Sequence, residues 1–117
     1  MDFNTYLDNF LSKHKPKAIL EIGFETGITS DIIQKHNPLL HVIVERNKDN
    51  YDNLLKWKKD KKTVMAFGED INNFTHHLSV DVIVDTKDNM DNSYLHHHNY
   101  KHYVSQFILI KDKIIER

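Results

Sequence analysis

Residues 18–27, with the sequence AILEIGFETG, limit the possible folds of this chain more than any other stretch. An apolar run that carries one acid, Glu21, leads into a turn with two glycines, and helical spacing of apolar residues begins at Ile28. This pattern predicts a strand, a tight loop and the start of a helix. A second apolar run, residues 41–44, ends at Glu45. Such a loop, followed by an acid after the next strand, is typical of a nucleoside-binding half-fold, because the acid accepts ribose hydroxyls.

The remainder of the chain alternates between helix-like and strand-like patterns. Apolar residues recur at helical spacing over residues 3–11, which predicts that the N-terminal segment, residues 1–17, is an amphipathic helix with Asp2 as its N-cap. Further helices are predicted from residue 47, over residues 71–78 and over residues 93–107, and further strands over residues 63–67 and 80–85. Residues 107–117 fit either a hairpin or a fifth strand, and their alternation favours the fifth strand.

This succession of elements predicts one α/β domain over residues 1–117. We expect a Rossmann-like, doubly wound parallel sheet of about five strands in the order 3-2-1-4-5, with helices on both faces. The nearly continuous apolar character of residues 18–22 and 42–44 agrees with strands that are covered on both sides.

The composition argues against several classes of protein. The chain has 117 residues, of which 39% are hydrophobic, so one core is expected. Its 16 basic and 17 acidic residues give a net charge of −1, which does not favour binding to nucleic acid or to an anionic membrane. There is no cysteine for a disulfide or a thiolate metal site. With no signal-like N-terminus and no apolar run of membrane length, a cytoplasmic protein is expected.

The glycine spacing argues against two common nucleotide-binding motifs. A dinucleotide fingerprint would need glycines at positions 23, 25 and 28, where this chain has Gly23, Glu25 and Ile28. A P-loop would need a Gly-Lys-Ser/Thr sequence, and none follows. The two glycines alone are equally consistent with a tight connection between strand and helix.

Acids at the ends of three predicted strands strengthen the case for a ligand site. They are Glu45, then Glu69 or Asp70, and finally Asp85. In an open α/β sheet the ligand crevice lies outside the carboxyl ends of the strands, so these acids should converge beside the glycine loop. The pattern therefore predicts a nucleoside site at this edge of the sheet.

These segments, in this order, resemble the class I S-adenosylmethionine-dependent methyltransferases, and most of all the guanidinoacetate N-methyltransferase family with its protein-arginine relatives. The family has a Leu-Glu-x-Gly-Phe-Gly stretch similar to residues 20–25, and a strand ending Ile-Ile-Glu similar to residues 43–45. A Leu-x-x-Trp helix is similar to residues 54–57, Glu-Asp to residues 69–70, Asp-Thr to residues 85–86, and an aromatic and histidine segment to residues 94–98.

The resemblance implies a site for S-adenosylmethionine as the cofactor. Its cofactor-binding residues would be Glu21, Gly23, Phe24, Glu25, Gly27, Glu45, Arg46, Glu69 and Asp70. Among these, Glu45 would bind the ribose hydroxyls, and Glu69 or Asp70 would lie near the adenine. Asp85 would be the catalytic residue beside the transferred methyl group, with Thr86 and His97 also binding the acceptor. The implied activity is N-methyl transfer to a small guanidino or amino compound.

Two departures from the family pattern keep alternatives open. Glu25 replaces the second glycine of the motif, and the chain is expected to stop after the fifth strand, without the family's C-terminal antiparallel strands. The first alternative is a catalytically silent protein or partner subunit that binds or sequesters S-adenosylmethionine or S-adenosylhomocysteine. The second is an enzyme that degrades S-adenosylmethionine. A sheet ending there would expose an edge, which favours a homodimer.

The histidines raise the question of a metal site. His98 and His102 have the spacing of a ligand pair on one helical face, and His96 and His97 lie next to them. No third ligand with suitable spacing accompanies them apart from the pair at positions 76 and 77. Structural or surface histidines are therefore favoured, and no metal is predicted.

Overall fold

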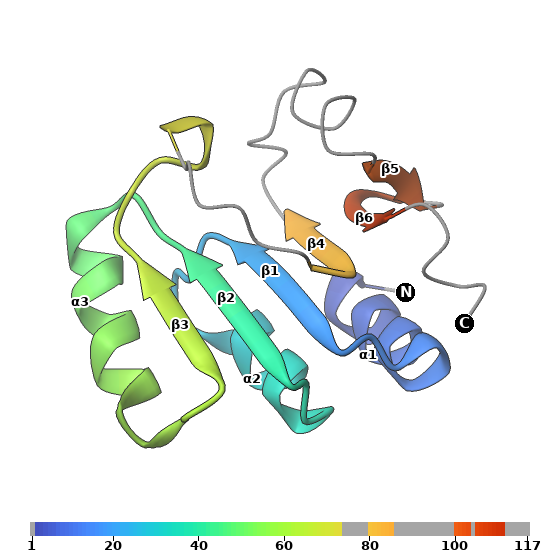
Figure 1. Ribbon diagram of the computed structural model, residues 1–117, viewed down its shortest axis with the longest axis horizontal. Coiled ribbons are helices and arrows are strands. Elements are labelled where there is room, and N and C mark those ends of the chain that lie inside the picture. Colours follow the sequence, from blue (N-terminus) through green and yellow to red (C-terminus); the bar gives the residue numbers. More distant parts are fainter. Residues whose placement is uncertain (1, 74–79, 86–99, 104, 112–117) are drawn as a thin grey trace.

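The computed structural model of the chain describes residues 2–73, 80–85, 100–103 and 105–111 (Figure 1). The helices are α1 (Phe3–His14), α2 (Ile28–Lys35) and α3 (Lys48–Trp57), with short 3-10 helices η1 (Lys58–Asp60) and η2 (Ile71–Asn73). The strands are β1 (Ala18–Ile22), β2 (Leu40–Val44), β3 (Val64–Phe67), β4 (Val82–Asp85), β5 (Tyr100–Tyr103) and β6 (Ser105–Lys111). No helix in this described part is long and apolar enough to cross a membrane.

The strands form a single sheet in the order β3-β2-β1-β4-β6-β5. The first four are parallel, and β1 lies between β2 and β4, with Glu21 opposite Ile43 on one side and Val84 on the other. This arrangement confirms the predicted Rossmann-like sheet and its order 3-2-1-4. The carboxyl ends of β1, β2 and β4 therefore meet at one edge, where the loop after β1 also lies.

The end of the chain differs from its prediction. A helix was expected over residues 93–107, but β5 and β6 occupy residues 100–103 and 105–111, so the helix is wrong over that part. Residues 93–99 lie outside the described residues. A strand does lie beside β4, as expected, but β6 pairs with β4 in the antiparallel direction. The C-terminal part thus contributes an antiparallel pair of strands, although the chain was expected to stop before the family's C-terminal antiparallel strands.

The short connection and the residue types explain this correction. One residue separates β5 from β6, and a connection of that length joins antiparallel strands, whereas a parallel pair needs a crossover of a dozen or more residues. Tyr100, Tyr103 and Phe107 are spaced as on a helix face. Aromatic and β-branched residues are nevertheless enriched in strands, and here the pairing with β4 prevails.

The three α-helices of the described residues pack on one side of the sheet, here called the helix-covered face, which carries Ile19, Glu21, His41, Ile43 and Val84. Its core contains Leu7, Leu11 and Ile33, together with a second cluster around Phe24 and Leu54. Figure 1 shows α1 and α2 side by side behind the sheet. Asp2 caps α1 as predicted, because its Oδ1 accepts a hydrogen bond of 2.8 Å from the backbone N–H of Thr5.

The other side of the sheet, here called the opposite face, carries the strand residues that alternate with these along each strand. Leu20, Val42 and Ile83 form a buried cluster there with Val80 and with Ile71 of η2. Helices on both faces were expected, and the described part of the opposite face carries only the short η2. The helix predicted over residues 71–78 begins as η2, and residues 74–78 lie outside the described residues.

Candidate functional site

Positive backbone φ angles define the loop between β1 and α2. Gly23 has φ of 90° and Gly27 has φ of 86°, a region that residues with a Cβ rarely adopt. The N–H of Gly23 donates to the Val44 carbonyl at 2.8 Å, which ties the loop to the end of β2. Glu25 also has a positive φ, of 51°. The chain therefore turns sharply at the end of β1 and exposes loop backbone at the carboxyl edge of the sheet.

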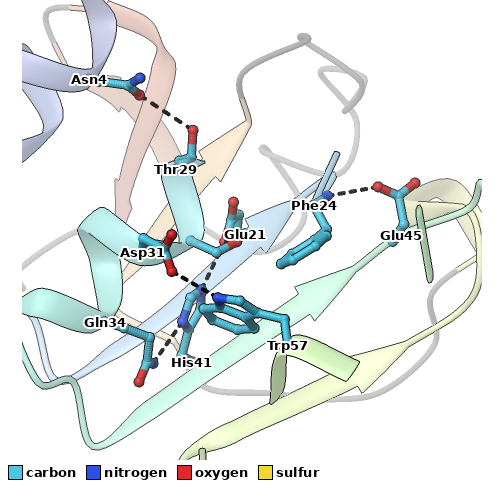
Figure 2. A network of polar contacts seen from close by, with 10 residues as sticks. Asn4, Glu21, Phe24, Thr29, Asp31, Gln34, His41, Glu45 and Trp57 are labelled. Carbon is cyan, nitrogen blue, oxygen red and sulfur yellow. Dashed lines mark hydrogen bonds and ion pairs between the residues drawn. The ribbon is translucent and has the colours of Figure 1, made fainter. Parts of the chain in front are cut away.

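Glu45 holds this loop in place from the end of β2. Its side chain is buried, and Oε1 accepts hydrogen bonds from the N–H of Phe24 at 2.7 Å (Figure 2) and from the N–H of Glu25 at 3.2 Å. Its Oε2 accepts the N–H of Asn47 at 2.9 Å. One carboxylate thus joins the glycine loop, the end of β2 and the start of α3.

Phe24 anchors the loop in the core. Its ring is buried, packs in a cluster with Ile43 and Leu54, and has its centroid 5.3 Å from that of the Trp57 ring. The backbone N–H of Phe24 points to Glu45, whereas its ring lies on the helix-covered face (Figure 2). Phe24 therefore fixes the placement of the loop.

A first cavity, here called the Glu45 cavity, lies at the carboxyl ends of β1 and β2. It has a volume of about 210 Å³ and is lined by Ile22, Gly23, Glu25, Val44, Glu45, Arg46, Asn47, Asn50, Asp70 and Ile71. Five residues predicted from the sequence are thus brought together here. Asn47 and Asn50 were not predicted as site residues, although their position shortly after Glu45, at the start of a predicted helix, was a signal for them.

A second cavity, the Thr29 cavity, lies against the same loop and the start of α2. It has a volume of about 330 Å³ and is lined by Phe3, Gly23, Phe24, Glu25, Thr26, Ile28 and Thr29. Thr29 Oγ1 donates to Asn4 Oδ1 at 3.4 Å, which links the start of α2 to α1 (Figure 2). Phe3 was not predicted as a site residue, because nothing in the local sequence indicates that α1 lies against this loop.

An ion pair lies at the rim of the Glu45 cavity. Arg46 Nη1 lies 3.3 Å from Asp70 Oδ2, and Asp70 Oδ1 accepts the N–H of Asn72 at 2.9 Å. The pKa of Asp70 is lowered from its ordinary value, first because of the Asn72 N–H and then because of the Arg46 guanidinium. The rim therefore carries an ionised carboxylate at neutral pH.

Glu21 is placed away from both cavities. Its side chain is 1% exposed and lies on the helix-covered face, where Oε1 is 2.7 Å from Ser30 Oγ and 2.9 Å from His41 Nε2. His41 Nδ1 lies 3.0 Å from Gln34 Nε2 (Figure 2). In this geometry Glu21 joins β1, β2 and α2 underneath the loop and lines neither of the two cavities. Its cofactor-binding role stays a prediction.

The remaining predicted residues are spread around the same edge. Glu69 is half-buried and does not line either cavity. Asp85 is buried at the end of β4, next to the last residue of β1, Ile22, with which it is in register. Thr86 and His97 lie outside the described residues. The roles assigned to all these residues stay predictions.

The arrangement defines a class of protein. A sheet with the order β3-β2-β1-β4, a glycine loop after β1 and an acid after β2 together form the Rossmann-like fold of S-adenosylmethionine-dependent methyltransferases. The sequence matches the family of guanidinoacetate N-methyltransferase over residues 6–114. Since that match covers nearly the whole chain, the protein belongs to this family, as the resemblance indicated.

Solved structures support the same fold. A proposed RNA methyltransferase from Pyrococcus horikoshii has a TM-score of 0.55 and 22% sequence identity, over 68% of this chain and 39% of that one. Protein arginine methyltransferase 10 from Arabidopsis thaliana has a TM-score of 0.51 and 20% identity, over 70% of this chain and 26% of that one. The chain thus spans well under half of either structure. No curated protein sequence matches it.

Proposed function

We propose that the chain binds S-adenosylmethionine across the loop of residues 23–27. The adenosine part would occupy the Glu45 cavity, with the ribose hydroxyls at Glu45 and the adenine toward Asp70. Glu45 Oε2 accepts one N–H from Asn47, and a carboxylate oxygen has two lone-pair sites, so it can accept a hydroxyl as well. This buried acid beside the loop is the observation that carries the proposal.

The methionine part would cross the loop at Gly23 and enter the Thr29 cavity. An added Cβ at Gly23 would meet no atom within 4 Å, so the space beside this backbone is open to a ligand. Ligand pockets commonly have about 300–1,000 Å³, and the Glu45 cavity alone is smaller than that. In the proposed binding mode S-adenosylmethionine therefore occupies both cavities, which share Gly23 and Glu25.

We further propose methyl transfer to a small guanidino or amino compound. S-adenosylmethionine supplies an electrophilic methyl group on a sulfonium. The protein's task is then to align the acceptor nitrogen in line with the C–S bond and to take up its proton. The buried carboxylate of Asp85, at the end of β4 and next to β1, is the candidate for holding the acceptor and receiving that proton. A homodimer through a sheet edge, formed by β3 or β5, stays a prediction.

A Glu45→Gln substitution tests the cofactor site. The amide keeps the shape of the side chain. It replaces one carboxylate oxygen, which would accept a ribose hydroxyl, with an NH2 group, which donates. A lost pair of charge-assisted hydrogen bonds costs about 1.5–3 kcal/mol, so the Kd for S-adenosylmethionine should rise at least about tenfold. Isothermal titration calorimetry with S-adenosylmethionine and S-adenosylhomocysteine measures this effect.

Asp81→Asn is a matched control, because Asp81 is a second buried acid that holds backbone amides. Its Oδ2 accepts the N–H groups of Lys17 at 3.0 Å and Ala18 at 3.2 Å, at the opposite end of β1 from the cavities. This variant should lose stability and keep its ligand affinity. Equal affinity losses in the two variants would mean that Glu45 acts only through folding. If S-adenosylmethionine does not bind to the unmodified chain, the proposed function is refuted.

A further inference from the structure

We propose that Glu25 makes this site select its ligand by positive charge, so that S-adenosylmethionine binds more tightly than its product S-adenosylhomocysteine. The inference rests on the proposed function, in which the ligand spans the loop of residues 23–27. It assigns to Glu25 a specificity-determining role in binding that the glycine of the family motif cannot have.

The backbone of Glu25 is the first observation. Its φ of 51° lies in the left-handed region. Contacts between Cβ and the backbone are unfavourable there, and glycine, which has no Cβ, adopts this region without that cost. The family motif has glycine at this position, whereas this chain has a carboxylate-bearing residue. Non-glycine residues in such conformations cluster at functional sites, where the side chain contributes more than the strain costs.

The position of Glu25 is the second observation. It lines the Glu45 cavity and also the Thr29 cavity, and the only other residue shared by the described linings of both is Gly23, which has no side chain. A ligand that passes from one cavity to the other therefore passes Glu25 at the crossing point. In the proposed binding mode this crossing point lies between the ribose and the amino-acid part, where the sulfur is.

The charge distribution is the third observation. Among the described residues that line the Glu45 cavity, the acids are Glu25, Glu45 and Asp70. The single cation among them is Arg46, which pairs with Asp70 and whose side chain is 69% exposed. In the described lining of the Thr29 cavity, Glu25 is the one charged residue. The described lining at the crossing point therefore carries more negative than positive charge, which favours a cation.

The chemistry of the two ligands turns this field into a preference. Both carry a carboxylate and an ammonium group, but S-adenosylmethionine also has a sulfonium charge, which becomes a neutral thioether when the methyl group leaves. Glu25 should thus attract the substrate more than the product. Because Glu25 is exposed, solvent and salt screen the attraction, and a modest effect of about threefold to fivefold in affinity is expected.

The test measures affinities for S-adenosylmethionine, S-adenosylhomocysteine and adenosine by calorimetry in Glu25→Gln and Glu25→Gly. Both variants should bind S-adenosylmethionine about threefold to fivefold more weakly and adenosine within about twofold of the unmodified chain, so that the substrate-to-product affinity ratio falls. Glu25→Gly also relieves the backbone strain, so the same loss in both variants identifies the charge. High salt should lower the ratio in the unmodified chain only.

Asp60→Asn is the charge-matched control. Asp60 lies in η1, at the opposite end of the sheet from the cavities, and its side chain is 85% exposed. This variant should keep the ratio. If the unmodified chain binds adenosine and S-adenosylmethionine but Glu25→Gln leaves the ratio unchanged, the inference is overturned and the proposed function stands. An equal loss for all three ligands also overturns it, and no binding by the unmodified chain refutes both.

Discussion

Gly23 and Gly27 serve the same loop for different steric reasons. Both have positive φ, but a Cβ at Gly23 would meet open space, whereas a Cβ at Gly27 would lie 2.8 Å from Cζ of Phe24. The Phe24 ring cannot simply move away, because it packs against Trp57 in the core. Gly27 is therefore needed both for its torsion angle and for its lack of a side chain.

Alanine substitutions at the two glycines should differ in cost. Gly23→Ala should lower the free energy of unfolding by about 1–2 kcal/mol, the cost of a left-handed torsion for a residue with a Cβ. Gly27→Ala should lower it by about 1–3 kcal/mol more, because it also overpacks the core at Phe24. Urea denaturation followed by circular dichroism checks this order, and equal costs would show that the Phe24 contact is relieved by a small shift of the loop.

At the scale of elements, a buried polar pair links β1, β2 and α2. Glu21 of β1 and His41 of β2 are 1% and 0% exposed, and their partners Ser30 and Gln34 come from α2. With the proton on Nε2, His41 donates to Glu21 and its Nδ1 accepts from the Gln34 amide. The ring of Trp57 lies nearly perpendicular to the imidazole, with centroids 6.2 Å apart. The loop between β1 and α2 therefore lies over a group of side chains whose orientation is fixed by polar contacts.

A double-mutant cycle should reveal this coupling. His41→Leu alone should cost about 3–5 kcal/mol of unfolding free energy, because it leaves the buried Glu21 carboxylate without its imidazole partner. Glu21→Leu combined with His41→Leu should cost at least about 1 kcal/mol less than the sum of the single substitutions. Chemical denaturation of the four proteins gives the values. Additive costs would mean that the two side chains contribute independently.

At the scale of the whole molecule, the position of Asp85 bears on whether the domain transfers a methyl group or only binds its donor. Asp85→Asn keeps the size of the side chain and removes the proton acceptor. On the proposed function, turnover with a small guanidino acceptor, with guanidinoacetate as the probe, should fall by about 10²–10⁴-fold, the usual contribution of a general base, while the Kd for S-adenosylmethionine stays within about twofold.

Production of S-adenosylhomocysteine, measured over time, checks the effect of this substitution. An equal loss of cofactor affinity in Asp85→Asn would place Asp85 in the cofactor site instead. Binding without turnover in the unmodified chain would favour the alternative of a protein that only binds the cofactor.

Local patterns in the sequence were enough to predict most of the sheet and one edge of the site. Strands β1 to β4, their order and the loop at Gly23 and Gly27 followed from apolar runs, glycines and the spacing of elements. The positions of Glu45 and Asp70 at one cavity followed as well, because the carboxyl ends of parallel strands meet at one edge. These features depend on neighbours in sequence or on a general rule of α/β sheets.

Tertiary structure alone decided the remaining features. β1 is buried on both faces, so no alternation of apolar and polar residues could tell that Glu21 points toward α2 and away from the ligand edge. The direction of β6 depends on pairing with β4, far away in the sequence, and outweighed a helix-like spacing. That Glu25 lines both cavities depends on how α1, the loop and β2 are packed, since the shape of a cavity is set by segments that meet only in the folded chain.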